Sequence, residues 1–346
     1  LVLDEAHYIK NPKTKLYTSV NQLKAERKLC LTGTPMENNL SEFWSQFNFL
    51  SVGFLGGHKQ FTKLFRTPIE KHGDHERKRL LNKRIRPFIL RRTKEKIAKD
   101  LPAKTEIIQT LKLAGKQAEL YESVRLSMDT KISQLISEKG IKRSQIEILD
   151  ALLKLRQVCN HPQLLPLNIA KKVNQSAKLD FLMDTVPELI SEGRKILIFS
   201  QFTSMLSLIE ETFNKEKIDY LKLTGATRNR QELVDKFQTG DTPVFLISLK
   251  AGGVGLNLTA ADTVIHFDPW WNPAVENQAT DRAHRIGQDK PVFVYKLIVE
   301  NSIEQTIQTI QKNKAELAEA LLSEEASDKK LTLTEDIVNA LMAPLS

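Results

Sequence analysis

Short, strongly apolar runs recur in two parts of the chain, within the first 50 residues and from about residue 176 onward. Such runs are typical of strands that are buried on both faces of a parallel sheet. Helical stretches separate most of the runs, and this alternation predicts βα units with a mostly parallel sheet. The predicted strands cover residues 1–3, 29–32, 195–200, 220–224, 244–248, 263–267 and 292–297.

Helical periodicity dominates elsewhere. Residues 37–50 carry Phe43, Trp44, Phe47 and Leu50 on one face of a predicted amphipathic helix, and we expect these side chains in a core. Between about residues 54 and 170 strand signals nearly vanish and the pattern is helical and charged. Apolar positions spaced for helix packing there are Leu120, Val124, Ile132, Leu135 and Ile136, and the prolines that interrupt the pattern are Pro87, Pro102 and Pro162.

These patterns divide the chain into four parts. The predicted fold class is α/β, with one α/β unit over residues 1–53, a helical insertion over 54–175 and a second α/β unit over 176–322. A linker and a terminal helix follow over 323–346, where Thr332 and Glu335 have the spacing of a capping box.

Composition excludes several classes of protein. No apolar run approaches the roughly 18 residues of a membrane span, and the chain begins inside a predicted strand rather than in a signal peptide. Because it also lacks an initiator Met, we expect it to be a piece of a longer polypeptide. Cys30 and Cys159 are far apart in the sequence, so we expect no disulfide and a reducing compartment. His161 adds only one candidate zinc ligand to Cys159, so we expect no zinc site.

Positive charge is concentrated in one segment. The net charge is +9, and residues 59–104 hold 16 Lys and Arg against 5 Asp and Glu, whereas the rest of the chain holds 35 basic and 37 acidic residues. A basic block is commonly a solvated face. Beside the candidate nucleotide-hydrolysis residues described below, it favours contact with a phosphate backbone.

The first strand leads directly into Asp4-Glu5-Ala6-His7. Ligands of open α/β sheets bind at the carboxyl ends of strands. In nucleotide hydrolysis Asp4 would hold Mg²⁺ through water, and Glu5 would polarise or deprotonate the attacking water. The alternative is an ordinary strand-to-helix turn whose acids cap the next helix.

Three further features follow in a fixed order. Thr32-Gly33-Thr34-Pro35 is a loop that follows a strand. Lys250–Asn257 is a glycine-rich loop after another strand, and its glycines allow the backbone to approach a phosphate or sugar closely. Gln278, Arg282 and Arg285 have the spacing of one helix face, where guanidinium groups could meet a γ-phosphate. Ordinary turns and a salt-bridge ladder with Glu276 and Asp281 are the alternatives.

Together these residues resemble the Swi/Snf family of ATP-dependent DNA translocases, within helicase superfamily two. The resemblance extends over nearly the whole chain. Besides the motifs above, it rests on Arg86–Arg92, Leu155–Pro162, Ile198–Gln201 and Trp271-Asn272-Pro273. Glu37-Asn38-Asn39 is more similar to bacterial or archaeal members than to eukaryotic ones.

The resemblance implies two RecA-like lobes, with the end of lobe one in residues 1–53, lobe two in 176–322 and the family's insertion between them. It implies ATP and Mg²⁺ as cofactors and duplex DNA as the substrate that is tracked. The implied catalytic residues are Asp4 (also the metal ligand), Glu5, Gln278, Arg282 and Arg285, and the implied cofactor-binding residues are His7, Gly253, Gly255 and Asn257. The implied nucleic-acid contacts are Thr32, Gly33, Arg91, Arg92, Ser200, Gln201, Lys250 and Trp271, although paired tryptophans such as Trp270-Trp271 more often belong to a core.

One departure limits the expected activity. The family's phosphate-binding Gly-Lys-Thr loop should precede Asp4, and Gly115-Lys116-Gln117 is no substitute. We therefore expect the piece alone to be inactive. Two other functions stay open, a strand-separating helicase of the same superfamily and a non-catalytic basic scaffold. We expect a monomer that binds double-stranded DNA, with a DNA-bound protein complex as a second candidate partner. We expect it in the prokaryotic cytoplasm at the nucleoid, or in a eukaryotic nucleus.

Overall fold

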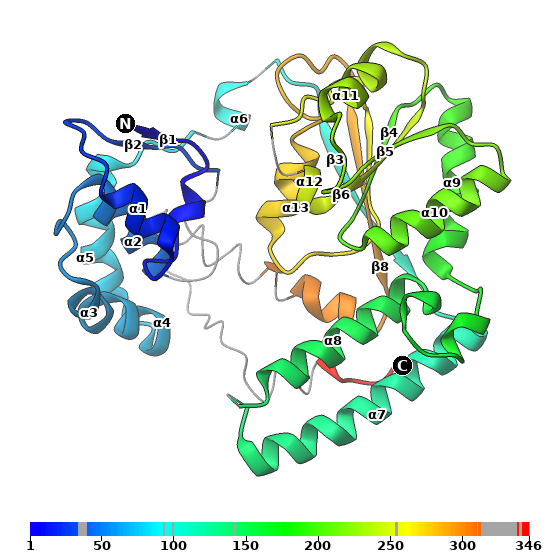
Figure 1. The fold of residues 1–346 in the computed structure, drawn as a ribbon, viewed down its shortest axis with the longest axis horizontal. Coiled ribbons are helices and arrows are strands. Elements are labelled where there is room, and N and C mark those ends of the chain that lie inside the picture. Colours follow the sequence, from blue (N-terminus) through cyan, green and yellow to red (C-terminus); the bar gives the residue numbers. More distant parts are fainter. Residues whose placement is uncertain are drawn as a thin grey trace. The chain divides into compact units, whose positions relative to one another are not determined.

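The computed structural model describes residues 1–33, 40–92, 94–98, 100–141, 143–252, 255–309, 311–312, 338 and 341–345. The chain divides into two compact units (Figure 1). Unit 1 is Leu1–Thr93 with Gln311–Thr332, and unit 2 is Lys94–Ile310 with Leu333–Ser346. No described helix is long and apolar enough to cross a membrane.

Unit 1 combines a small parallel sheet with short helices. Strands β1 (Val2–Leu3) and β2 (Leu29–Cys30) pair in parallel. The helices are η1 (Ala6–Ile9), α1 (Lys15–Asn21), α2 (Leu40–Leu50), α3 (His58–Phe61), the π-helical η2 (Thr62–Arg66), α4 (Thr67–His72), α5 (His75–Ile85) and η3 (Arg86–Phe88). The predicted helix over 37–50 is confirmed from Leu40 onward, and its aromatic residues are buried with side chains of α3, η2 and α5.

The prediction that the first strand is buried on both faces is wrong. Val2 is 58% exposed, and Leu29 on the paired strand is 51% exposed. In the described part of unit 1 this sheet has two strands of two residues each. A sheet of two such short strands is too small for its apolar side chains to be buried on both of its faces.

Unit 2 is built on a six-stranded sheet in the order β3-β8-β7-β4-β6-β5, in which every pairing is parallel. The predicted strands are confirmed as β4 (Ile196–Ser200), β5 (Tyr220–Leu223), β6 (Val244–Ser248), β7 (Thr263–His266) and β8 (Val292–Val299). Strands β4, β6 and β7 are buried along their whole length, which explains their continuous apolar sequence.

Helices cover both faces of this sheet (Figure 1). Alternate residues of β4 point to opposite sides, so Ile198 packs against α9 (Ala177–Ser191) and α10 (Thr203–Lys215). Phe199 packs on the other side with residues of α11 (Arg230–Thr239), α12 (Leu249–Gly252) and α13 (Pro273–Thr280). This is the predicted α/β layering.

Strand β3 (Lys104–Leu111) is missing from the sequence prediction, which placed these residues in an all-helical segment. It pairs with β8 at the edge of the sheet. Its residues are exposed or half-buried, and only Ile107, Ile108 and Leu111 are apolar. An edge strand needs no continuous apolar run, so the signal that found the central strands is absent here.

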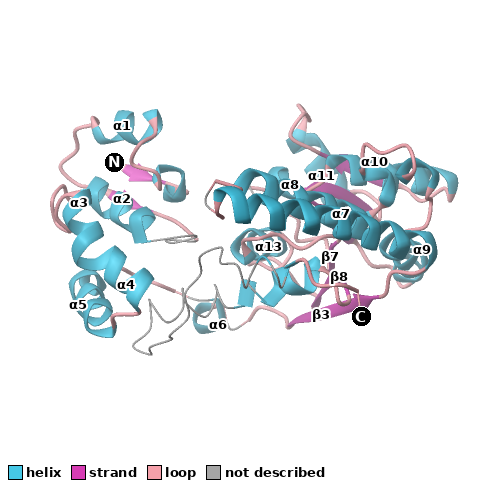
Figure 2. Cartoon of the chain, turned by 90° about the horizontal axis from the view of Figure 1, so that it is seen from below, coloured by secondary structure: helices cyan, strands magenta, loops and turns pink. Residues whose placement is uncertain are grey.

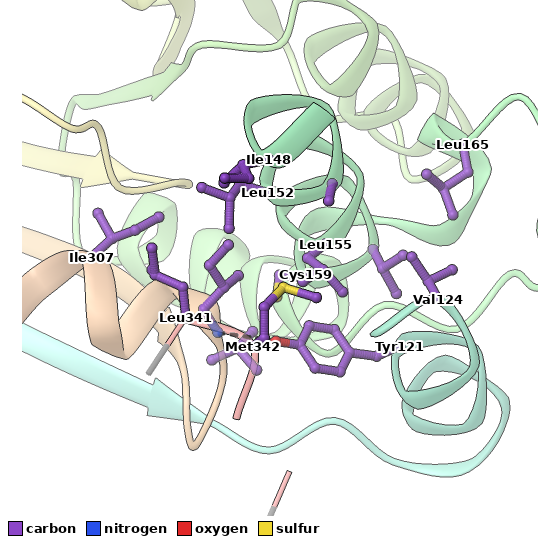
Figure 3. Packing of buried hydrophobic residues seen from close by; sticks show 14 of the residues in the cluster. Tyr121, Val124, Ile148, Leu152, Leu155, Cys159, Leu165, Ile307, Leu341 and Met342 are labelled. Atoms are coloured by element: carbon purple, nitrogen blue, oxygen red, sulfur yellow. Dashed lines mark hydrogen bonds between the residues drawn. The ribbon is translucent and has the colours of Figure 1, made fainter. Parts of the chain in front are cut away.

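Helices α7 (Gly115–Lys139) and α8 (Gln145–Asn160) lie side by side (Figure 2). Tyr121 and Cys159 are fully buried between them, and Leu341 and Met342 from the end of the chain join the same cluster (Figure 3). Burial raises the pKa of the Cys159 thiol well above its usual value. Both cysteines are unpaired, and the described residues contain no cluster of three potential metal ligands.

The compact units part near residue 93, because α3 to α5 share the apolar core of α2, whereas Lys94 onward belongs to unit 2. The boundaries predicted at residues 53, 175 and 322 stay predictions. A short α6 (Lys94–Ile97) begins unit 2. Of the predicted terminal helix, Thr332 and Glu335 lie outside the described residues.

Candidate active site

The two acids of unit 1 lie where two parallel strands end. Asp4 and Glu5 follow β1, and Thr32 and Gly33 follow β2, so all four lie at the same edge of the sheet. The Ala6 amide donates to the Leu31 carbonyl over 2.9 Å and ties the two loops together. The structure therefore brings the predicted catalytic acids and the predicted Thr-Gly loop to one place, while Thr34 and Pro35 lie outside the described residues.

Glu5 has a left-handed backbone conformation (φ 49°, ψ 50°), which is uncommon for a residue with a side chain. It occupies the N-cap position of η1 without a side-chain capping bond. Its Oε2 instead lies 3.2 Å from Nδ1 of His7, and Oδ1 of Asp4 accepts a hydrogen bond from the Glu5 amide. The Glu5 carboxylate thus does not serve as the ordinary helix cap that was the alternative.

The acidic pair has the donor set that suits a hydrated Mg²⁺. Magnesium keeps several waters and is commonly held by one or two carboxylates together with substrate phosphates. Asp4 is exposed, and the Glu5 amide occupies only one of its two carboxylate oxygens. One exposed carboxylate fits a metal that takes its other ligands from water and nucleotide.

In unit 2, Ser200, Gln201 and the start of the glycine loop lie at the carboxyl ends of neighbouring strands. Strand β4 lies between β7 and β6. Ser200 and Gln201 end β4, and the glycine loop begins after β6. Asp268, just after β7, accepts hydrogen bonds from the Ser200 hydroxyl and the Gln201 amide. Because Asp268 is 2% exposed, this pairing fixes the ends of β4 and β7 against each other.

The arginine segment is not the continuous helix that its spacing predicts. Helix α13 ends at Thr280, and the next backbone bonds run from the Arg282 amide to Ala279 and from the Ala283 amide to Thr280. Gln278 is therefore helical, while Arg282 and Arg285 lie in the turns that follow. We name residues 281–285 the arginine turn.

Both arginines bind carbonyls of the loop after β6. Arg282 Nε donates to the Gly252 carbonyl over 3.1 Å, and Arg285 Nη1 donates to the Leu256 carbonyl over 3.2 Å. The Leu258 amide donates back to the Arg282 carbonyl. The structure thus brings together the two predicted groups that are 30 residues apart, the glycine loop and the arginines.

Two glycines of this loop have different roles. A Cβ on Gly252 would lie 2.7 Å from the Phe199 ring, so only glycine fits there. Gly255 has φ +52° and open space around it, and Asn257 beside it is exposed. Gly253, the other predicted cofactor-binding glycine, lies outside the described residues.

Gln288 is a structural residue that the sequence reasoning missed. Its Nε2 donates to the carbonyls of Thr259, Ala261 and Ala283, and its Oε1 accepts from two backbone amides. It is 7% exposed. This side chain anchors the end of the arginine turn to the loop before β7.

Arg156 of α8 was also missed, although it lies within the Leu155–Pro162 run. It is 3% exposed, donates to the Pro269 carbonyl, and has Asp268 Oδ2 at 4.0 Å. Its guanidinium carbon lies 5.9 Å from the Trp270 ring centre and 5.6 Å from that of Trp271. Trp271 also packs against the α7–α8 core, which supports the core alternative for the paired tryptophans.

The remaining predicted nucleic-acid contacts are surface cations. Arg91 and Arg92 are exposed in unit 1, and Lys250 is exposed at the start of the glycine loop in unit 2. Exposure makes these cations accessible to a phosphate backbone, and their role in binding stays a prediction.

Comparison with known proteins gives two matching families. The SNF2-related domain matches residues 1–164, and the helicase conserved C-terminal domain matches residues 177–287. The chain is 42% identical over 333 residues to the putative ATP-dependent helicase/translocase YwqA of Bacillus subtilis, covering 94% of this chain and 36% of that protein. It is 38% identical over 319 residues to the human SWI/SNF-related matrix-associated actin-dependent regulator of chromatin subfamily A member 1, covering 89% and 30%.

Among solved structures, the chain is similar to the Sulfolobus solfataricus SWI2/SNF2 ATPase core in complex with dsDNA. The TM-score is 0.57 at 38% identity, and the match covers 100% of this chain and 72% of that one. The predicted fold class is confirmed by this likeness and by the parallel sheet. The chain spans about a third of the length of the curated relatives it matches.

Proposed function

Because this chain belongs to the SWI/SNF family of ATP-dependent helicases, we propose that it is part of an ATP-dependent double-stranded DNA translocase. ATP hydrolysis between two RecA-like units would drive movement along the duplex. One observation carries the proposal, the pair of arginines that both bind carbonyls of the glycine loop between β6 and β7 of unit 2. This arrangement supports a nucleotide phosphate site.

The proposed roles follow from the chemistry of the side chains. Glu5 acts on the attacking water, and Arg282 and Arg285 stabilise charge that develops on the transferred phosphate. Arginine has five N–H donors, so the carbonyl bond of Arg285 orients its guanidinium without using all of them. Gln278, one helical turn before Arg282, and His7, beside Glu5, are proposed to act with these groups.

Magnesium, when bound, would neutralise phosphate charge, and Asp4 is the residue that would hold it through water. The adenine nucleotide would also meet Gly255 and Asn257, where the loop leaves open space. ATP would close the two units on each other, and hydrolysis would release them.

Duplex DNA would be held through its backbone. We propose Thr32, Gly33, Arg91 and Arg92 as contacts from unit 1, and Gln201 and Lys250 as contacts from unit 2. Ser200 is buried and donates to Asp268, and Trp271 packs against the α7–α8 core, so neither is proposed as a contact. Such contacts position a protein on DNA without reading sequence. The dsDNA complex of the archaeal relative supports DNA as the partner.

The chain of residues 1–346 by itself should hydrolyse ATP negligibly. Its sequence contains no Gly-x-x-x-x-Gly-Lys-Ser/Thr pattern, the loop that cradles nucleotide phosphates. A DNA-stimulated turnover by this piece, measured with purified protein and abolished by Glu5→Gln, would contradict the expectation.

The test of the proposed function uses the full-length protein. Arg285→Ala should lower the DNA-stimulated ATPase rate by about 10³-fold or more, the size expected for an arginine at the γ-phosphate, with DNA affinity unchanged. Arg228→Ala, at an exposed arginine of the same unit, is the control. Displacement of a triplex strand without unwinding of a duplex would separate a translocase from a strand-separating helicase. Turnover near the wild-type rate in Arg285→Ala would overturn the arginine assignment.

A further inference from the structure

The segment that enters unit 2 contacts the arginine turn at two points. Lys94, the first residue of α6, lies with its Nζ 2.5 Å from Oδ1 of Asp281 and donates to the His284 carbonyl over 2.7 Å. Asp281 and His284 flank Arg282, and His284 is followed directly by Arg285. One ammonium group therefore bridges both ends of the stretch that carries the first arginine.

The second contact comes from the other end of the same segment. His284 Nε2 donates to the Pro102 carbonyl over 2.9 Å. The Val292 amide donates to the next carbonyl, of Ala103, where the chain continues into β3. Residues 94–102 are thus attached at one end to Asp281 and at the other end to His284.

We propose that Lys94 and the Pro102 carbonyl act as a clamp that positions the arginine turn for the nucleotide. Lys94 is then a positioning residue rather than a catalytic one, because it acts through Arg282 and Arg285. The inference rests on the proposed function, in which these arginines meet the phosphate. It assigns Lys94, two residues after the basic pair Arg91-Arg92, to an intramolecular ion pair instead of to DNA.

Loss of the clamp should change the ATPase rate much more than the free energy of unfolding. The Lys94 and Asp281 side chains are 38% and 44% exposed, and such exposed pairs contribute about 0–1 kcal/mol. The sheet and Gln288 hold the fold independently of Lys94. A displacement of about 1 Å in a positioned group, by contrast, can lower a rate by about 10²-fold.

The experiment measures ATP hydrolysis by the full-length protein at saturating DNA. Lys94→Ala should lower kcat by about tenfold, with KM for ATP, DNA affinity and the unfolding midpoint nearly unchanged. The single changes Lys94→Asp and Asp281→Lys should each impair kcat, and their combination should restore most of it. Lys154→Ala removes a comparable exposed pair, Lys154 with Asp150 on α8, and should have no effect.

A second measurement does not depend on activity. Hydrogen exchange at the amides of residues 281–288 should speed up in Lys94→Ala and in His284→Phe, while amides of β4 and β7 keep their protection. If the variants show faster exchange but the wild-type protein has no DNA-stimulated ATP hydrolysis, the clamp is supported and the proposed function is contradicted. Unchanged exchange, unchanged kcat, or a loss confined to DNA affinity would overturn the clamp.

Discussion

The predicted catalytic residues form an acidic half in unit 1 and an arginine half in unit 2, and the two are built on sheets of very different completeness. In unit 1, Asp4 and Glu5 follow a strand of two residues, and the Ala6–Leu31 backbone bond ties their turn to the neighbouring loop. In unit 2, three adjacent strands end together, and side chains of the arginine turn are bonded to backbone carbonyls.

This difference teaches where each half gains its geometry. The arginine half is positioned by tertiary contacts of its own unit, including the fully buried Asp268 pairing and Gln288. The acidic half depends on a local backbone conformation, the left-handed Glu5. Substitutions in unit 1 should therefore act mainly on chemistry, whereas several in unit 2 should act on packing as well.

The largest effect is expected from Glu5→Gln in the full-length protein. Removal of a general base typically lowers a rate by about 10²–10⁴-fold, and the partly exposed side chain contributes little to packing. Steady-state ATPase assays should show this loss with unchanged DNA affinity. Glu26→Gln, an exposed acid of the same unit, is the matched control. A rate within twofold of wild type would remove Glu5 from the mechanism.

The next effect concerns the buried ion pair of unit 2. Lys178 and Glu304 are both fully buried, with Nζ 2.7 Å from Oε1, and Nζ also binds Asn160 and the Phe267 carbonyl. Lys178→Met leaves Glu304 without its cation, and breaking such a pair costs about 3–5 kcal/mol. Native-state hydrogen exchange at the amides of β4 and β7 would measure the free energy of opening.

The same pair offers its own control. Lys178→Met combined with Glu304→Leu removes both charges, and the double variant should recover much of the lost stability. Burial raises the pKa of Glu304, an effect that Lys178 opposes. A loss below about 1 kcal/mol in the single variant would mean that water reaches the pair.

A pH effect of intermediate size is expected from His266, which is buried between Phe199 and Thr280. Burial lowers its pKa from 6.5 to about 3. Between these values the unfolded chain binds a proton that the native state excludes, so stability falls as the pH drops below 6.5. The expected loss at pH 5 is about 2 kcal/mol relative to pH 7.

The slope of opening free energy against pH, measured by hydrogen exchange at β4 and β7, tests this. His266→Gln should flatten the slope, and a residual slope of the same sign is expected from His161, whose pKa is lowered to about 4 by burial. The exposed His72 in unit 1 provides a control substitution, His72→Gln. An unaltered slope in His266→Gln would contradict the assignment.

The smallest effect is expected from single exposed cations of unit 1. Arg91→Ala and Arg92→Ala should each weaken DNA binding and reduce the slope of log K against log salt by about 0.9, the value for one phosphate contact. Titrations at several salt concentrations measure the slope. Arg143→Ala, at an exposed arginine outside the basic segment, should leave it unchanged. If the Arg91 and Arg92 variants also leave the salt slope unchanged, the basic segment is a solvated face.

The central strands of unit 2 could be predicted because their burial on both faces requires continuous apolar sequence, as in Ile196–Phe199. Strand β3 could not, because an edge strand tolerates Lys104, Glu106 and Gln109. The spacing of Gln278, Arg282 and Arg285 fits two alternatives equally well, one face of a continuous helix or a helix end followed by turns. The bonds that decide between them are those from the Arg282 and Ala283 amides to the carbonyls of Ala279 and Thr280, together with the Leu258 amide that donates to the Arg282 carbonyl.

The amino-acid sequence by itself determined the family and the parallel α/β sheet and supplied the candidate acids and arginines, because each depends on local pattern and residue type. Only the tertiary structure decided which groups meet, since hydrogen bonds between residues far apart in the chain leave no periodic signal. The contacts of Arg156 with the paired tryptophans, the Asp268 pairing and the contacts of Lys94 with the arginine turn are of this kind. Their partners become neighbours only when the sheet orders its strands, because the segments that enter and leave neighbouring strands then lie side by side.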